Sequence, residues 1–142
     1  MKVKLLNPKA TLPVRSTPHA SGFDITALLD GSLWLHPNNT LAIKTGLALE
    51  IPENQTGLLI PRSGLGTKNG VVMANTIGVI DPDYRGELIV QLYNRSHLPY
   101  EIKNGDRIAQ LVLVPRYQAE IEVVEELSDT ERGTGGFGST GN

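Results

Sequence analysis

Short apolar runs separated by turn-forming residues are the feature of this sequence that most limits its possible folds. Within Leu47–Ile51 and Leu88–Leu92 apolar residues recur at every second position, and Ile108–Val114 is almost continuously apolar. Clusters of turn-forming residues stand between the runs, at 35–39, 52–54, 68–70, 81–83 and 103–105. A period of two with turns at this spacing is typical of short β-strands. We therefore predict one all-β domain, a sandwich or barrel without long helices.

The composition excludes several classes of function. The chain has no Cys, which rules out disulfides, thiolate metal sites and a cysteine nucleophile, and its three His are too scattered for a paired-histidine metal site. Its net charge of −2 provides no general basic surface for nucleic acid or membranes. No apolar stretch approaches the length of about 18 residues that spans a membrane. We expect a soluble cytoplasmic protein that binds neither nucleic acid nor membranes.

Charge is distributed unevenly along the chain. Residues 120–132 contain six acidic residues and one Arg, so this segment carries −5 and the rest of the chain +3. A site for an anionic ligand must therefore be built locally from a few Arg and Lys.

One polar segment has the donors that a phosphate group needs. Arg62, Ser63 and Gly64 combine a permanent cation, a hydroxyl and an unobstructed backbone N–H. We expect Pro61–Asn69 to be a loop in which a helical turn can form. The alternative is a surface turn with a solvated Arg62.

Two carboxylates stand at positions where they can do chemistry. Asp81 follows the apolar Ile77–Ile80 and precedes the alternating Glu87–Tyr93, the layout of a β-hairpin with an acid at its rim. It can activate a water as general base, or it can be an ordinary turn residue. Asp24 lies within a predicted strand and needs a partner there, either a cation such as Arg107 or a metal-bound water.

The last residues form a Gly-rich segment that composition predicts to be flexible. Gly133, Gly135 and Gly138 match a dinucleotide-binding pattern by letter, but the strand and helix context and the phosphate-loop Lys are missing. The segment can wrap backbone N–H groups around an anion, with Arg132 before it, or it can be a disordered tail.

Taken in order, five segments resemble one family, the homotrimeric all-β dUTP pyrophosphatases (dUTPases). They are Ala20–Ala27, Pro61–Gly66, Asn75–Glu87, Gly105–Leu111 and Arg132–Gly141. The resemblance implies a distorted β-barrel or jelly-roll-like sandwich over 1–124, and a flexible arm over 125–142 that closes over an active site. It also implies Mg²⁺-assisted hydrolysis of dUTP to dUMP and pyrophosphate, which keeps uracil out of DNA and supplies dUMP for thymidylate synthesis. Gly66 departs from the Ala that is frequent in the family.

The resemblance also assigns roles to individual residues. It makes Asp81 the general base that orients the attacking water, and it places the phosphates on Arg62, Ser63, Gly64 and Gln110, of which Arg62 and Gln110 also act in catalysis. Asp24 corresponds to a carboxylate that reaches Mg²⁺ through a water, the ion itself being held mainly by the substrate phosphates. The uracil pocket of the family falls on Asn75, Gly78, Val79, Ile80 and Ile89, with Tyr84 under the deoxyribose.

By the same resemblance, the arm and the oligomer complete the site. The residues implied to close over the nucleotide are Arg132, Phe137, Gly138, Ser139 and Thr140. The family is homotrimeric and builds each active site from three subunits.

Two other functions fit parts of the sequence. The segment around Asp81 also resembles the dCTP deaminases, but the Glu that those enzymes use for proton transfer falls on Gln91, which cannot shuttle protons. A β module that binds nucleotide or a protein partner without turnover is the non-enzymatic alternative.

Overall fold

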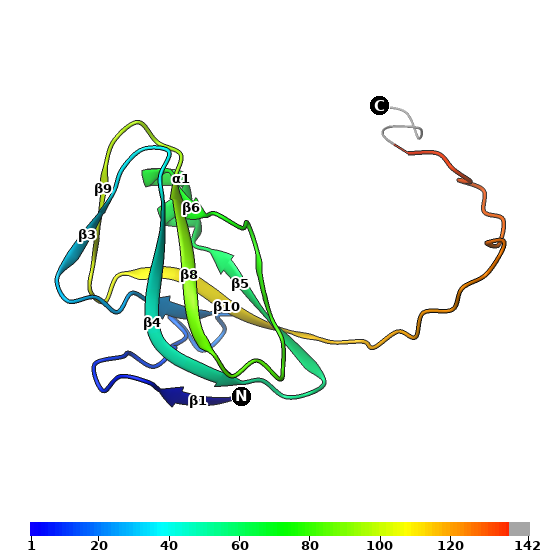
Figure 1. Cartoon of the computed structure of the whole chain (residues 1–142), viewed down its shortest axis with the longest axis horizontal. Helices are drawn as coiled ribbons and strands as arrows, with labels where there is room; N and C mark the ends of the chain where they lie inside the picture. The colour runs from blue at the N-terminus through cyan, green and yellow to red at the C-terminus, as the bar shows by residue number, and fades with distance from the viewer. Residues whose placement is uncertain (137–142) are drawn as a thin grey trace.

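Within residues 1–136 the chain forms ten β-strands and one short helix (Figure 1). The computed structural model describes residues 1–136. The elements are β1 (Lys2–Leu5), β2 (Phe23–Thr26), β3 (Ser32–Leu35), β4 (Thr40–Glu50), β5 (Gln55–Pro61), α1 (Ser63–Asn69), β6 (Val71–Met73), β7 (Gly78–Ile80), β8 (Glu87–Asn94), β9 (Tyr100–Lys103) and β10 (Arg107–Pro115).

The strands form three antiparallel sheets that share one core. The first sheet has the order β1-β4-β8-β6, the second β2-β10-β5-β7, and β3 pairs with β9 in a small third sheet. Side chains from all three sheets are fully buried in a single cluster, for example Ile25 from β2, Val90 from β8 and Ile102 from β9. The prediction of one all-β domain is confirmed.

The period-two pattern correctly identified which side chains face the core. Along β8, Leu88, Val90 and Leu92 are buried, whereas Ile89 and Gln91 between them are exposed. Ile108–Val114 lies within β10, which is hydrogen-bonded on both sides, to β2 and to β5. Residues 108–114 are all buried or half-buried, and a strand covered on both faces is expected to be apolar over most of its length.

The segment after β5 is more regular than the loop we expected, because Ser63–Asn69 forms the helix α1. Leu65 anchors this helix by packing into the core. Gly70 ends it in the left-handed conformation, at φ 68°, and donates its N–H to the Leu65 carbonyl. The intrinsic helix propensity of a Ser-Gly-Leu-Gly start is low, so packing rather than propensity stabilises this helix.

The predicted hairpin around Asp81 is wrong in its pairing. The strand before the loop, β7, is bonded to β5, and the strand after it, β8, is bonded to β4 and β6. The loop at 81–86 therefore crosses from one four-stranded sheet to the other. As a result, β7 is an edge strand of its sheet.

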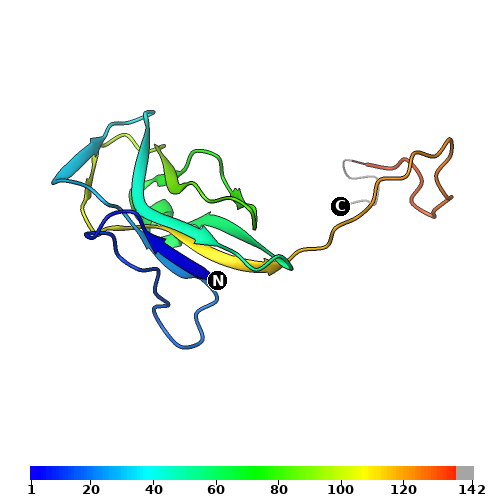
Figure 2. The ribbon, with the colours of Figure 1, turned by 60° about the horizontal axis from the view of Figure 1, so that its bottom comes forward.

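Beyond β10 the chain leaves the body. The Arg116 N–H still bonds to the Asn54 carbonyl, and residues 117–136 then run away from the sheets without regular secondary structure (Figures 1 and 2). Every hydrogen bond that residues 117–136 make within the described chain stays inside this segment. Among the described residues, no helix has the length and apolar character needed to cross a membrane.

Candidate active site

A buried carboxylate, Asp24, lies at the centre of one group of predicted site residues. It stands on β2 directly opposite Gln110 on β10, and on its other side Gln110 faces Ile60 of β5, two residues before Arg62. Three neighbouring strands thus place Asp24, Gln110 and Arg62 at the same end of the sheet. Asp24 is only 2% exposed.

Four donors occupy the two oxygens of Asp24. Oδ1 accepts hydrogen bonds from Arg62 Nε at 3.2 Å and Gln110 Nε2 at 3.1 Å. Oδ2 accepts hydrogen bonds from Ser16 Oγ at 2.7 Å and Arg107 Nη1 at 3.1 Å. The expectation that Asp24 needs a cation such as Arg107 agrees with these contacts. The carboxylate holds two of the predicted phosphate-binding side chains in place.

The same contacts determine the protonation of Asp24. Burial alone would raise its pKa, but the hydrogen bonds from Ser16, Gln110 and Arg107, together with the charge of Arg62, outweigh burial and lower the pKa. Asp24 is therefore ionised at neutral pH and keeps Arg62 and Gln110 fixed.

Arg62, Ser63 and Gly64 lie together where β5 passes into α1. Arg62 occupies the position just before the helix, and its Nη1 also donates to the Arg107 carbonyl at 3.5 Å. A Cβ at Gly64 would meet no atom within 4 Å, so packing inside this chain does not require a glycine there. Because Gly64 has no side chain, the backbone at this point is open to the close approach of a ligand.

The residues around Asp24 are better suited to an Mg²⁺ ion that is held mainly by substrate phosphates than to one held by protein ligands. Within residues 1–136 no group of three or more His, Asp or Glu side chains is placed to hold a metal. The oxygens of Asp24 are already occupied by four donors, which leaves contact through a water as the arrangement that fits. Mg²⁺ commonly keeps several waters and is bound through substrate phosphates with few protein ligands.

The second group of predicted residues lies on the loop between β7 and β8. Val79, Ile80, Asp81, Tyr84, Glu87, Leu88 and Ile89 line a hollow of ≈ 190 Å³ there. Tyr84 donates its hydroxyl to the Glu87 carbonyl at 3.0 Å, and a Cβ at Gly86 would overlap the Tyr84 phenol. Arg85 donates to the carbonyls of Pro82 and Tyr84, at 2.5 and 3.1 Å, which fixes the loop from inside.

Two strands beside this hollow have an unpaired edge. The β6 pairing with β8 ends near Gln91, where the Ala74 N–H bonds to the Gln91 carbonyl at 2.9 Å, and within residues 1–136 β7 is paired with β5 alone. Val79 is 62% exposed and Ile89 43% exposed. The predicted Asn75 lies in the turn before β7, its side chain close to Gly78, and Thr76 beside it has a left-handed φ of 62°. Unpaired strand edges of this kind can bind a planar ligand that has its own donors and acceptors.

The two groups lie at opposite ends of β5. Ile80 pairs with Gly57 at one end of this strand, whereas Arg62 follows Pro61 at the other. Gly57 and Pro61 are four residues apart, about 13 Å along the strand. The hollow beside Arg62 measures ≈ 270 Å³, so both hollows are smaller than the roughly 300–1,000 Å³ typical of ligand pockets. A single chain therefore presents two separate half-sites.

The arm contributes one described candidate. Arg132 lies in the extended segment, where its Nε donates to the Gly135 carbonyl at 2.9 Å. Phe137, Gly138, Ser139 and Thr140 lie outside the described residues, so the roles expected of them stay predictions.

Two positioning side chains were not found from the sequence. Ser16, which bonds to Asp24, lies in a polar loop eight residues earlier and carries no local signal. Arg85 lies on the loop after β7, and its bonds to two loop carbonyls depend on the folded loop.

Comparisons with known proteins all point to one family. The sequence model of the dUTPase family matches residues 8–141 of the chain. Deoxyuridine 5'-triphosphate nucleotidohydrolases of Acinetobacter baumannii and Histophilus somni are 47% and 48% identical to it, over 99% and 98% of this chain and 97% and 95% of their own lengths.

Solved structures give the same match. The dUTPase of Staphylococcus bacteriophage 80alpha, solved with dUpNHpp, superposes with a TM-score of 0.90 at 34% identity and covers 99% of this chain and 98% of that one. A dUTPase from phage phi11 of S. aureus, described with a structural Mg(II) ion, has a TM-score of 0.79 at 32% identity and covers 88% and 96% of the two chains.

Proposed function

This chain belongs to the dUTPase family and hydrolyses dUTP to dUMP and pyrophosphate, and from that premise we propose how its residues carry out the reaction. The observation that carries the proposal is the separation of the two half-sites along β5. Each half-site has part of the required chemistry, so we propose that the protein is a homotrimer whose subunits complete one another's sites.

The half-site around Asp24 binds the phosphates. Arg62 and Gln110 are held by a buried, ionised carboxylate, and Ser63 and the Gly64 N–H add neutral donors at the start of α1. Groups that are fixed before the reaction stabilise developing charge without reorganising. Mg²⁺ would be held mainly by the substrate phosphates, with Asp24 reaching it through a water, and it would offset phosphate charge in the transition state.

The half-site on the 81–86 loop supplies the base and recognises the nucleoside. Asp81, exposed in a single chain, takes a proton from a water as the water oxygen attacks the α-phosphorus. The bond from the α-phosphorus to the oxygen bridging to the β-phosphate breaks, and pyrophosphate leaves with the bonding electrons. General-base assistance of this kind contributes about 10²–10⁴-fold.

In this proposal the unpaired edges of β7 and β8 and the ring of Tyr84 select the nucleoside. The edge of uracil presents acceptor, donor and acceptor, which main-chain groups of β7 and β8, together with Asn75, can complement. Tyr84, bound to the Glu87 carbonyl, packs under the deoxyribose and leaves no room for a 2′-hydroxyl. Steric exclusion in a fixed pocket discriminates strongly between such substrates.

The arm closes the assembled site. Residues 117–136 make no hydrogen bond to the described body of their own chain, which leaves them available to a neighbouring subunit. In this proposal Arg132, Ser139 and Thr140 contact the terminal phosphate, Phe137 covers the uracil with Gly138 beside it, and closure excludes water.

Pyrophosphate release measured with dUTP, UTP, dTTP and dCTP in the presence of Mg²⁺ tests the proposal. Rapid release from dUTP alone, lost on chelation of the metal, is the expected result. Comparable release from UTP would contradict the role of Tyr84. If no nucleotide were turned over, the protein would be a β module that binds without catalysing hydrolysis.

A further inference from the structure

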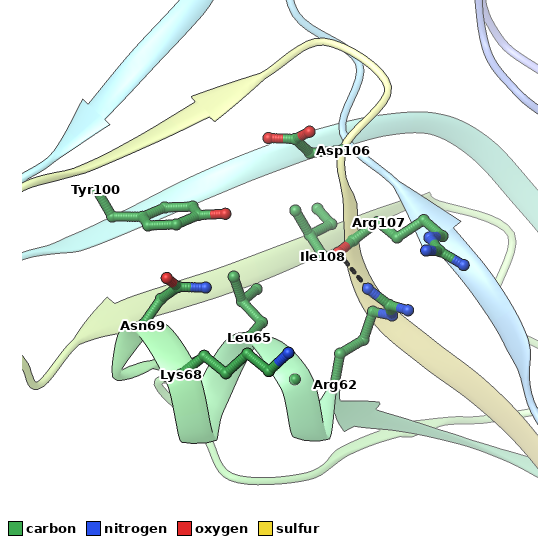
Figure 3. Close-up of a pocket in the computed structure, with 9 residues that line it drawn as sticks. Arg62, Leu65, Lys68, Asn69, Tyr100, Asp106, Arg107 and Ile108 are labelled. Atoms are coloured by element: carbon green, nitrogen blue, oxygen red, sulfur yellow. Dashed lines mark hydrogen bonds between the residues drawn. The ribbon is translucent and has the colours of Figure 1, made fainter.

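A lysine one helical turn beyond the phosphate-binding residues has no role so far. Lys68 lies on α1 four residues after Gly64, so the two positions share a face of the helix and are about 6 Å apart along its axis. Side chains on a helix lean toward its N-terminal end. Figure 3 shows the Lys68 amine extending along α1 toward Arg62, into the space between the helix and β10.

This space is the hollow that also contains Arg62. Its floor is apolar, formed by Leu65 and Ile108, and its polar rim includes Lys68, Tyr100 and Asp106. Arg62 and Arg107 also line the hollow, but both donate to the carboxylate of Asp24, whereas no carboxylate within residues 1–136 pairs with Lys68.

Within residues 1–136, no acidic side chain forms an ion pair with Lys68. Among residues 1–136 the ion pairs involve other lysines and arginines, and no carboxylate oxygen lies within 4.0 Å of Lys68 Nζ. Asp106 lines the same hollow, but one of its oxygens accepts the Lys103 N–H at 2.8 Å. Burial and the charge of Asp106 raise the pKa of Tyr100, so its phenol stays a neutral donor.

We propose, given the function above, that Lys68 binds the terminal phosphate of dUTP and then the leaving pyrophosphate, so that this hollow selects triphosphates over shorter nucleotides. The triphosphate runs from the α-phosphate, at the carboxylate of a neighbouring Asp81, to the donors at the start of α1. Its far end must continue past Arg62 and Gly64, and the hollow with Lys68 is the adjoining space. An amine is suited to this end because a lysine has a compact charge on a flexible side chain, which can keep its contact with the phosphate while the bond breaks.

A ligand series that varies only in phosphate number tests this. The affinities of dUMP, dUDP and an α,β-imido analogue of dUTP are measured by calorimetry on the full-length wild type and on Lys68→Met. We expect the variant to bind the triphosphate analogue roughly 10-fold more weakly, as for the loss of one charged hydrogen bond, and to bind dUMP within about 2-fold of the wild type. Inhibition of dUTP turnover by inorganic pyrophosphate should weaken in parallel, and KM should rise with little change in kcat.

Matched variants separate this role from a general effect. Lys68→Arg keeps the charge and should retain most of the triphosphate affinity, whereas Lys9→Met removes a remote surface lysine paired with Asp30 and should change none of the three affinities. Met keeps a high helix propensity at an exposed position, and Lys68→Gln provides a second neutral variant if Lys68→Met folds poorly.

The possible outcomes are distinct. Equal weakening of dUMP and the triphosphate analogue, or unchanged binding of both, would overturn the proposal for Lys68 while leaving dUTP hydrolysis intact. A wild type that fails to release pyrophosphate from dUTP would overturn the proposed function instead, and binding of inorganic pyrophosphate would still test Lys68.

Discussion

At the scale of single residues, Asp24 links the stability of the fold to the phosphate side of the site. It is a buried charge whose two oxygens are shared among Ser16, Arg62, Arg107 and Gln110. Removing one member of a buried charged network leaves the others uncompensated. If Arg62 and Gln110 bind the phosphates as proposed, Asp24 orients them, and its loss should lower stability as well as activity.

Asp24→Asn should lower the free energy of unfolding at pH 7 by about 3 kcal/mol, the lower end of the usual range because Arg107 is half-exposed. The pKa of Asp24 is lowered in the folded state, so its contribution is complete above the ordinary value of about 3.9 and is lost as the pH falls through the folded value. The difference between wild type and variant should accordingly shrink below about pH 4. Urea titrations at several pH values and one protein concentration measure it.

Asp30→Asn is the matched control for that series. Asp30 is a carboxylate on the surface, 95% exposed and paired with Lys9 at 3.5 Å, so its substitution should not measurably change stability. A pH-independent difference between wild type and Asp24→Asn would contradict the assigned ionisation of Asp24.

Gly86 controls the placement of Tyr84. Because a Cβ at Gly86 would overlap the phenol, Gly86→Ala must displace the ring from its position beside the Glu87 carbonyl. We expect the ratio of kcat/KM for dUTP over UTP to fall by roughly 10-fold or more, since a displacement of about 1 Å in a fixed site is costly. Tyr84→Phe keeps the ring and should change the ratio less. An unchanged ratio in Gly86→Ala would show that the ring does not read the sugar.

At the scale of elements, the sequence predicted strands better than it predicted their partners. Alternation along Leu88–Leu92 identified the buried face of β8, because that pattern is a property of a single strand. The pairing of β7 with β5 depends on contacts distant in sequence, such as Val79 opposite Leu58, and the neighbouring loop 81–86 suggested a hairpin instead. For a related reason the sequence indicated only a loop with a possible helical turn at 61–69, because Leu65 stabilises the full helix α1 through the core.

The predicted site shows the same division. A resemblance to known motifs was needed to group Asp24 on β2, Gln110 on β10 and Arg62, which directly follows β5. Ser16 belongs to no such segment, and only the folded loop brings its hydroxyl to Asp24. Residues that act through another side chain leave little trace in a single sequence.

The arm is the element whose removal should separate folding from catalysis. Truncation after Glu131 removes Arg132 and the Gly-rich segment, and no described hydrogen bond connects this part to the body. We expect an unchanged thermal melting curve and a kcat/KM for dUTP lowered at least ~10²-fold, because the site can no longer close. An unaffected rate would make the segment a spacer.

At the scale of the whole molecule, the length of β5 matters most. Asp81 follows β7 at the Gly57 end of β5, and Arg62 follows β5 at its Pro61 end, so the proposed base and the proposed phosphate donors of one chain lie too far apart to act on a single phosphorus. In the proposed homotrimer, the Asp81 half-site of one subunit can face the Arg62 half-site of the next, three times by symmetry. Each active site would then need residues from more than one subunit.

Mixing two inactive variants tests this sharing directly. Asp81→Asn removes the base and Arg62→Gln removes a phosphate donor, so each homotrimer should hydrolyse dUTP at least ~10²-fold more slowly than the wild type. When equal amounts are unfolded together and refolded, a site is intact wherever a subunit with Arg62 meets a neighbour with Asp81. Random assembly gives this at about a quarter of the sites, so about a quarter of wild-type activity should return. Mixing without unfolding is the control and should restore little, and if both residues acted within one chain the co-refolded mixture would stay inactive.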